Sequence, residues 1–242
     1  MAYSITYTIP GLPLLNQLVE ASNPRDDCVF TSSAAIATWR SGGSPRYSGT
    51  QLKAMDNNYG PSYVGFASAA NLVDTLAKLG VKLAAINEPT QQRLIDLLHW
   101  QIEHYHQPCL ITMPSQWNSA PLASGWNPRT YRGYSHVGVM CGSGAGMLRC
   151  MNPWGGFWQD QSDSWWAERL LEGQIWVATR IGLPAPATPP PASSQGATGA
   201  STATSSATAQ PTVLSEYQEI LALREEIARL KAARAAALKA LS

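Results

Sequence analysis

The stretch DCVFT at residues 27–31 places a cysteine at the head of an apolar run, and it is followed by SHVGV at residues 135–139 and NPWGG at residues 152–156. A thiol becomes a strong nucleophile when it ionises, and a nearby imidazole supplies both that ionisation and a proton for the leaving group. A third polar group must then orient the ring. The order Cys, His, Asn therefore predicts a cysteine hydrolase.

Cys28 is expected at the start of a helix. Residues 29–39 are small and apolar, as in a buried helix, and Asp26 or Asp27 can cap its N-terminus. The free N–H groups and the macrodipole at a helix start stabilise a thiolate, so cysteines there have pKa values of about 3.5 to 7.5 instead of about 8.5. Two uncapped carboxylates nearby would oppose that ionisation, and activation would then depend more heavily on His136.

His136 and Asn152 are expected on neighbouring antiparallel strands. An apolar strand over 137–141 follows the histidine, the glycine-rich segment 142–146 favours a hairpin turn, and a second strand over 147–151 leads to the asparagine. Such a hairpin brings the imidazole and the amide together. The separate helix would carry the thiol to the same cleft.

The chain resembles a papain-like cysteine peptidase over residues 10–180, most nearly the type that processes bacteriocin leaders and its relatives among phage and bacterial wall hydrolases. NPWGG is the most specific part of the resemblance, because it is similar to the Asn-x-Trp-Gly of papain relatives and to the Asp-Pro-Trp-Gly of the leader-processing type. The resemblance implies an α+β fold, in which a central helix bearing Cys28 packs on an antiparallel sheet bearing His136 and Asn152. It also implies that Gln17 and the Cys28 N–H form an oxyanion hole.

Two features depart from the family pattern. Gln17 lies further upstream of Cys28 than is usual, and Val29 stands where the family has Gly or Trp directly after the nucleophile. A bulkier residue at that position would narrow the cleft. An inactive relative that kept the fold, such as a non-enzymatic virion or binding protein, is therefore the alternative to an enzyme.

The residues between the cysteine and the histidine are expected to form helices and strands in alternation. Hydrophobic spacing predicts a helix over 71–80, a strand over 81–86, a helix over 91–106 and a strand over 108–113. A long loop over 116–134 then leads to His136.

Aromatic residues near the predicted site are candidates for substrate binding. Trp117, Trp126 and Tyr131 in the long loop can stack on a sugar or flank a peptide, and Trp154 follows Asn152 closely enough to shield its hydrogen bond from water. Filling the edge of the core is the alternative role for each of them.

The remaining cysteines and histidines are expected to be structural. Cys109, Cys141 and Cys150 lie in apolar runs typical of buried thiols, although Cys141 and Cys150 flank the predicted turn, so a disulfide between them stays open. Three histidines cluster between residues 99 and 106, but no second ligand pair with the spacing of a zinc site accompanies them. We therefore expect no metal and no cofactor.

Composition divides the chain into three parts. Residues 1–183 hold all nine Trp, all four Cys and all four His, and the whole chain has 17 basic and 16 acidic residues, so its charge is nearly balanced. A neutral enzyme domain is a poor binder of nucleic acid. Residues 184–212 consist almost entirely of Pro, Ala, Ser, Thr, Gly and Gln without charge, which predicts a flexible linker.

The tail over 213–242 is predicted to be an amphipathic coiled-coil helix that forms homo-oligomers. Apolar residues recur at alternating spacings of three and four, with charged residues between them. The Ile and Leu positions favour a parallel dimer, whereas Arg234 at a core position would weaken the seam. A single amphipathic helix docked on another surface is the alternative.

No apolar run approaches the ~20 residues that cross a bilayer, and residues 1–5 lack a basic region followed by an apolar core, so we expect neither a membrane span nor a secretory signal. We therefore expect synthesis in the cytoplasm and action at the cell wall or within a phage particle. The expected activity is cleavage of an amide bond in a peptide or in peptidoglycan, as an endopeptidase or amidase. A leader-cutting peptidase is a rival, but that type usually sits beside a transporter membrane region.

Overall fold

The computed structural model describes residues 4–64, 67–117, 124–131 and 133–181, which belong to the first of two units of the chain, residues 1–188. The predicted linker and coiled-coil helix, 184–212 and 213–242, lie outside the described residues. The described helices are α1 (Gln17–Glu20), α2 (Cys28–Arg40), α3 (Gly49–Met55), the 3-10 helix η1 (Ala69–Leu72), α4 (Val73–Lys78), α5 (Gln91–Tyr105) and α6 (Asp163–Ala167).

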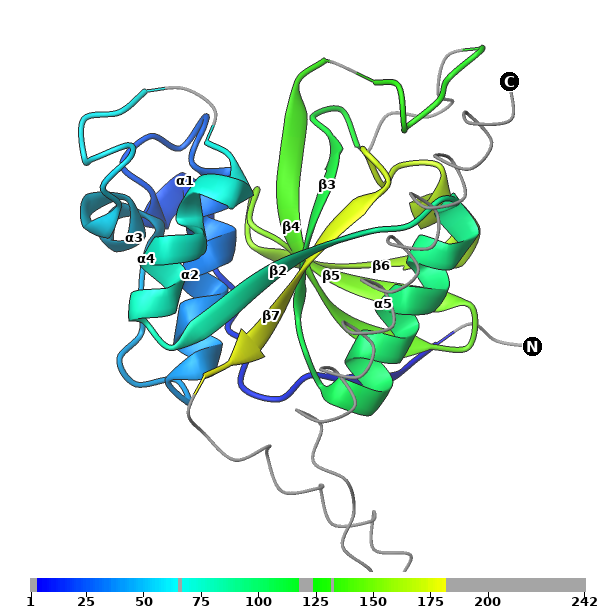
Figure 1. Ribbon diagram of the computed structural model, residues 1–242, viewed down its shortest axis with the longest axis horizontal. Coiled ribbons are helices and arrows are strands. Elements are labelled where there is room, and N and C mark those ends of the chain that lie inside the picture. Colours follow the sequence, from blue (N-terminus) through cyan, green and yellow to red (C-terminus); the bar gives the residue numbers. More distant parts are fainter. Residues whose placement is uncertain (1–3, 65–66, 118–123, 132, 182–242) are drawn as a thin grey trace, which may run out of the picture. The chain divides into compact units, whose positions relative to one another are not determined.

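The described strands form one antiparallel sheet. They are β1 (Ile5–Thr8), β2 (Val81–Asn87), β3 (Cys109–Pro114), β4 (Ser135–Gly144), β5 (Met147–Asn152), β6 (Phe157–Ser162) and β7 (Gln174–Arg180). Their order is β2-β7-β3-β4-β5-β6, and β1 pairs with the far end of β4. Helices α1 to α4 gather on one side of the sheet, and α5 lies on the other (Figure 1). The expected α+β fold with an antiparallel sheet is therefore confirmed.

Helix α2 is the central helix and positions the cysteine. Every residue from Cys28 to Trp39 is buried, and such a helix, covered on all sides, carries side chains that are small or apolar. The Ser32 hydroxyl donates a hydrogen bond to the carbonyl oxygen of Val137 at 3.1 Å, which fixes α2 against the start of β4. Cys28 lies one helical turn before Ser32 and is therefore held beside the same strand, which also carries His136.

The β4–β5 hairpin is longer than the sequence predicts. Segment 142–146 was expected to be the turn, but β4 continues through Gly144, and only Ala145 and Gly146 connect the strands. The glycines serve a different purpose, because a Cβ at Gly144 would lie 2.0 Å from the carbonyl oxygen of Ser4. Glycine here permits the close approach of the segment that contains β1.

The other predicted elements are present with small shifts. The helix expected over 71–80 is η1 followed by α4, and Gly80 beyond it has a φ of +77°. β2, α5 and β3 correspond to the elements expected over 81–86, 91–106 and 108–113. None of the described helices has both the length and the apolar content needed to cross a bilayer.

All four cysteines are free thiols in the structure. The disulfide left open between Cys141 and Cys150 is not formed. Cys150 pairs with Met140, whereas Cys141 lies at an irregularity between Met140 and Gly142 and so has no direct partner across the hairpin.

Candidate active site

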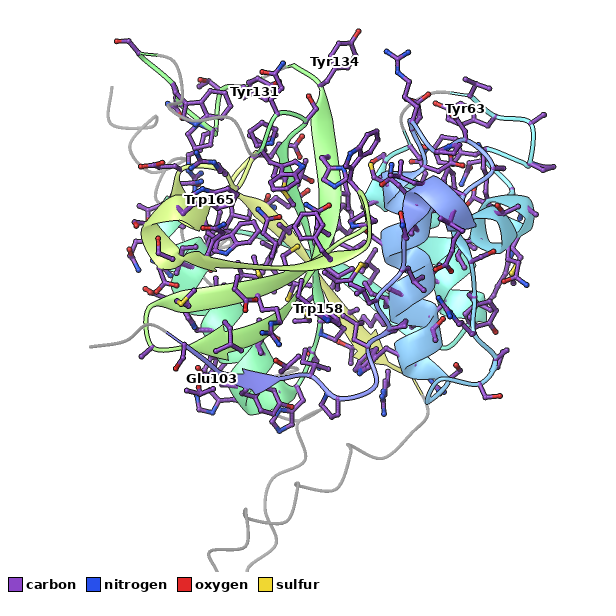
Figure 2. The ribbon with its side chains drawn as sticks, turned by 180° about the vertical axis from the view of Figure 1, so that it is seen from behind. Tyr63, Glu103, Tyr131, Tyr134, Trp158 and Trp165 are labelled. Atoms are coloured by element: carbon purple, nitrogen blue, oxygen red, sulfur yellow. The ribbon has the colours of Figure 1, made fainter. Side chains whose placement is uncertain are left out.

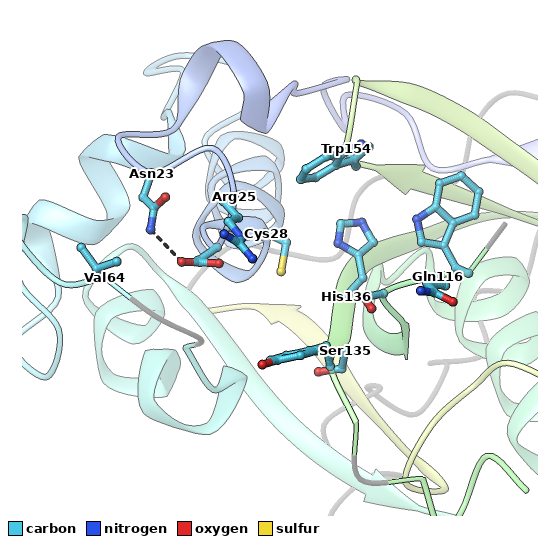
Figure 3. A pocket seen from close by; sticks show the side chains of 12 residues that line it. Asn23, Arg25, Cys28, Val64, Gln116, Ser135, His136 and Trp154 are labelled. Carbon is cyan, nitrogen blue, oxygen red and sulfur yellow. Dashed lines mark hydrogen bonds between the residues drawn. The ribbon is translucent and has the colours of Figure 1, made fainter. Parts of the chain in front are cut away.

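A cleft of about 840 Å³ lies between the start of α2 and the start of β4, and both Cys28 and His136 line it (Figure 3). The helix contributes the thiol, and the sheet contributes the imidazole. Ser115 and Gln116, which follow β3, and Trp154, which follows β5, also line the sheet side. The structure therefore brings together the two groups that the chain order singled out.

The Cys28 sulfur is surrounded by backbone N–H groups but is hardly reached by water. The N–H groups of Val137, Val29 and Cys28 act to lower the thiol pKa. Burial is the larger effect, and with a smaller contribution from the Asp27 carboxylate it raises the pKa of Cys28 to about 11. The lowered pKa expected from the helix start is therefore wrong for this structure, because only 5% of the side chain is exposed and removing the thiolate from water outweighs the helix dipole.

His136 is a neutral imidazole of defined tautomer. Its Nε2 lies 2.9 Å from Oδ1 of Asn152, and because an amide oxygen can only accept, Nε2 carries the proton. Burial lowers the pKa of His136 to about 4, although the Asn152 hydrogen bond acts in the opposite direction. Nδ1 is then unprotonated and can accept a proton.

The Asn152 amide is itself held in one orientation. Its Oδ1 also accepts a hydrogen bond from the Trp154 N–H at 3.0 Å, and its Nδ2 donates to Oε1 of Gln159 at 2.8 Å. Gln159, in β6, was not predicted, because its strand lacks a clear apolar alternation. Its buried Nε2 finds no hydrogen-bond partner among the described residues.

This arrangement predicts that Asn152→Asp raises the pKa of His136. A carboxylate oxygen still accepts from Nε2, and its charge stabilises the imidazolium, so we expect the pKa to rise from about 4 by roughly one to three units. Gln159 can turn its amide so that the unpartnered Nε2 donates to the new carboxylate. NMR titration of the ring measures the shift, with exposed His104 as internal control. An unchanged His136 titration would contradict the assigned hydrogen bond.

Gln17 lies beside the cleft but does not line it. It is fully buried, its Nε2 donates to the Pro24 carbonyl at 2.8 Å, and its backbone N–H donates to the Pro153 carbonyl at 2.9 Å. Gln17 thus ties together the segments before Cys28 and after Asn152. Its role as an oxyanion donor stays a prediction.

Of the four aromatic residues that the sequence singled out, Trp117 and Trp154 line the cleft, and 43% of Trp154 is exposed. Trp126 and Tyr131 instead pack on each other, with ring centroids 4.9 Å apart. The Trp126 indole donates to the Glu168 carbonyl, and the Tyr131 hydroxyl donates to the Tyr134 carbonyl. These contacts stabilise the loop, and neither Trp126 nor Tyr131 forms part of the cleft wall.

Tyr134, which was not predicted, also lines the cleft. Figure 2 shows Tyr131 and Tyr134 at the same end of the molecule, beyond the start of β4. Trp117 is fixed by ring packing on Phe157 and by a hydrogen bond from Arg169 to its carbonyl. The sequence signal that could have indicated Tyr134 as a cleft-lining residue is its position two residues before His136.

Val29 does not narrow the cleft. It is 3% exposed and belongs to the core, and it is not among the residues that line the cavity. The side chain that follows Cys28 therefore points into the protein.

The His99 ring connects three elements. It contacts the Ser143 hydroxyl at 2.6 Å and an Asp163 carboxylate oxygen at 2.9 Å, so it joins α5 to β4 and α6. Among the described residues, no group of three or more His, Cys, Asp or Glu side chains is placed to hold a metal ion.

The chain was also compared with known proteins. No protein-family model matches it, and no curated protein does. A crystal structure of a protein described as a C39-like peptidase from Bacillus anthracis matches with a TM-score of 0.50 and 16% identity, covering 75% of this chain and 100% of that one. This likeness shows that the chain has the fold of C39-like, papain-like peptidases.

Two further solved structures match with lower scores. One is a double glycine motif protease from an AMS/PCAT transporter in complex with the leader peptide, with a TM-score of 0.46 and 14% identity over 75% of this chain and 100% of that one. The other is the peptidase domain of Streptococcus ComA, a bifunctional ABC transporter, with a TM-score of 0.43 and 17% identity over 64% of this chain and 93% of that one.

Proposed function

We propose that the chain is a thiol-dependent hydrolase that cleaves the peptide part of bacterial peptidoglycan or the amide that joins this peptide to the glycan. The observation that carries the proposal is the shared cleft, with Cys28 at the head of α2 and the hydrogen-bonded pair of His136 and Asn152 on the sheet. The C39-like fold supports the reaction class.

In the first step, Nδ1 of His136 accepts the thiol proton while the Cys28 sulfur forms a bond to the substrate carbonyl carbon. Both groups are neutral beforehand, since the thiol pKa is about 11 and the imidazole pKa about 4. Proton transfer therefore accompanies the attack. The π electrons move to the carbonyl oxygen, where the Cys28 N–H at the free start of α2 can stabilise the charge.

In the second step, the imidazolium of His136 returns the proton to the leaving nitrogen as the C–N bond breaks, which leaves a thioester on Cys28. A water molecule then attacks the thioester carbon and gives a proton to Nδ1. The C–S bond breaks, the thiol recovers the proton, and the carboxylic acid departs. Asn152 holds the ring in one tautomer throughout.

The wall substrate is supported by two observations. Arg25 and Asp26 both line the cleft, so it does not favour substrates of one charge, and its aromatic side chains Trp117, Tyr134 and Trp154 can contact a peptide or a sugar. The enzyme unit is also followed by an uncharged Pro-, Ala-, Ser- and Thr-rich segment and an amphipathic tail, an order that resembles phage wall hydrolases. Action at the wall or within a phage particle belongs to the same proposal.

The proposal is tested with purified sacculi and with a soluble linear peptide. The wild type is expected to reduce the turbidity of sacculi and to release fragments whose masses show one hydrolysed amide, whereas Cys28→Ala releases none. Cleavage of the linear peptide but not of sacculi would support the hydrolase activity and contradict the proposed wall substrate. No difference between wild type and variant on either substrate would overturn the enzymatic function and favour the non-enzymatic alternative.

A further inference from the structure

Lys53 in α3 is a buried charged residue that the proposed mechanism does not use. Its Nζ lies 2.9 Å from Oδ1 of Asp27, and the two side chains are 1% and 0% exposed. Removing two charges from water is costly, and buried pairs replaced by apolar residues often leave stability unchanged. Stability alone therefore does not account for this pair.

Asp27 immediately precedes the nucleophile and occupies the N-cap position of α2, yet its side chain makes no capping hydrogen bond. Its Oδ2 instead accepts hydrogen bonds from the backbone N–H of Asn23 at 2.8 Å and from the Ser22 hydroxyl at 3.2 Å. The carboxylate is therefore turned away from the helix axis, toward the segment that forms the cleft rim. Its negative charge raises the pKa of Cys28.

Lys53 provides the compensating positive charge. Its ammonium also lies over the rings of Phe30 and Tyr63, 5.6 and 6.0 Å from their centroids, and Figure 2 shows Tyr63 on the same side of the molecule as the cysteine helix. The ammonium is thus fixed between aromatic faces and the carboxylate. Removing it would leave an unpaired buried anion one residue from the thiol.

Other charged and titratable groups also face the cysteine. Arg25 and Asp26 line the cleft rim, His136 enters from β4, and the Asp26 carboxylate accepts a hydrogen bond from the Asn23 amide. Asp27 is the charged residue nearest to Cys28 along the chain, and within the described residues it forms an ion pair with Lys53.

We propose that Lys53, acting through Asp27, sets the reactivity of the Cys28 thiol and is a positioning residue of this site. The inference rests on the proposed function for its biological meaning. Its test does not, because thiol alkylation needs no substrate. Lys53 partly offsets the charge of Asp27 and, through the bonds of Asp27 to Ser22 and Asn23, holds the cleft rim against α3.

The test is the rate at which iodoacetamide alkylates Cys28 at pH 8 in the full chain, followed by mass spectrometry of the Cys28 peptide. We expect Lys53→Met to lower the rate at least threefold and Asp27→Asn to raise it at least threefold. A shift of one pKa unit changes the thiolate fraction about tenfold, and the opposing change in nucleophilicity leaves about a threefold effect. The Asp27→Asn, Lys53→Met double variant should return to within twofold of the wild type.

Lys78→Met is the matched control, because it removes the same charge from an exposed position of α4 and should leave the rate unchanged. Changes in the same direction in the two single variants, or rates within twofold of wild type in folded proteins, would overturn the proposal. If Lys53→Met does not fold, Asp27→Asn and the double variant decide the test, because the proposal requires the single variant to react faster than both the double variant and the wild type. If the wild type hydrolyses substrate but the variants alkylate at the wild-type rate, only the role of Lys53 is overturned. If the alkylation rates shift as expected but the wild type hydrolyses nothing, the role of Lys53 stands and the proposed enzymatic function is overturned.

Discussion

His136→Gln is expected to lower kcat/KM of the proposed hydrolase by about three orders of magnitude, the middle of the range that general acid-base catalysis contributes. A glutamine amide can still donate a hydrogen bond to Oδ1 of Asn152 and so preserve that contact. It cannot accept the Cys28 proton, because an amide is not basic near neutral pH. The variant therefore removes the proton carrier with little change in shape.

The measurement is hydrolysis of whichever substrate the wild type cleaves, with the thermal midpoint as the check on folding. His104→Gln is the matched control, because it makes the same exchange on the exposed face of α5, away from the cleft, and should leave kcat/KM unchanged. A His136→Gln enzyme within tenfold of wild type would contradict the role of the imidazole as general base.

The positions of Cys28, His136 and Asn152 were predictable because each depends on a local signal. A small-residue helix start identified the first, and a short antiparallel hairpin brought the other two together. The hairpin connects residues only 16 positions apart, so its geometry is largely fixed by the strands themselves.

The ionisation of Cys28 was not predictable from the same signals. A helix start favours a thiolate, but whether water reaches the sulfur depends on the packing of β4 and the cleft rim against α2. Burial is a property of the whole fold, and it reverses the direction expected from the helix alone.

Pairings between strands and segments that are distant along the chain could not be predicted from the sequence either. β7 lies between β2 and β3, although it follows every other described strand in the chain. Gln159 reaches Asn152 only because β6 pairs with β5, and Lys53 reaches Asp27 only because α3 packs on α2. A buried lysine contradicts the usual rule that charges are exposed, so no pattern of apolar residues indicates it.

Lys53→Met is expected to destabilise the protein by about 3 to 5 kcal/mol, because breaking a buried ion pair on one side leaves the other charge unpaired. Asp27 would keep its hydrogen bonds from Ser22 and Asn23 but lose the ammonium 2.9 Å away. Urea unfolding monitored by tryptophan fluorescence measures the change in free energy.

The double variant Asp27→Asn, Lys53→Met separates two contributions to the loss of stability, the cost of an unpaired charge and the loss of the ion pair itself. Adding Asp27→Asn to Lys53→Met removes the stranded anion while its amide oxygen still accepts from Asn23, so the double variant should recover most of the lost stability. The pair of exposed Arg46 and half-buried Glu20, with side chains 57% and 21% exposed, is the control, and Arg46→Met should cost at most about 1 kcal/mol. Equal losses for Lys53→Met and the double variant would show that packing of the lysine stem, and not the unpaired carboxylate, accounts for the effect.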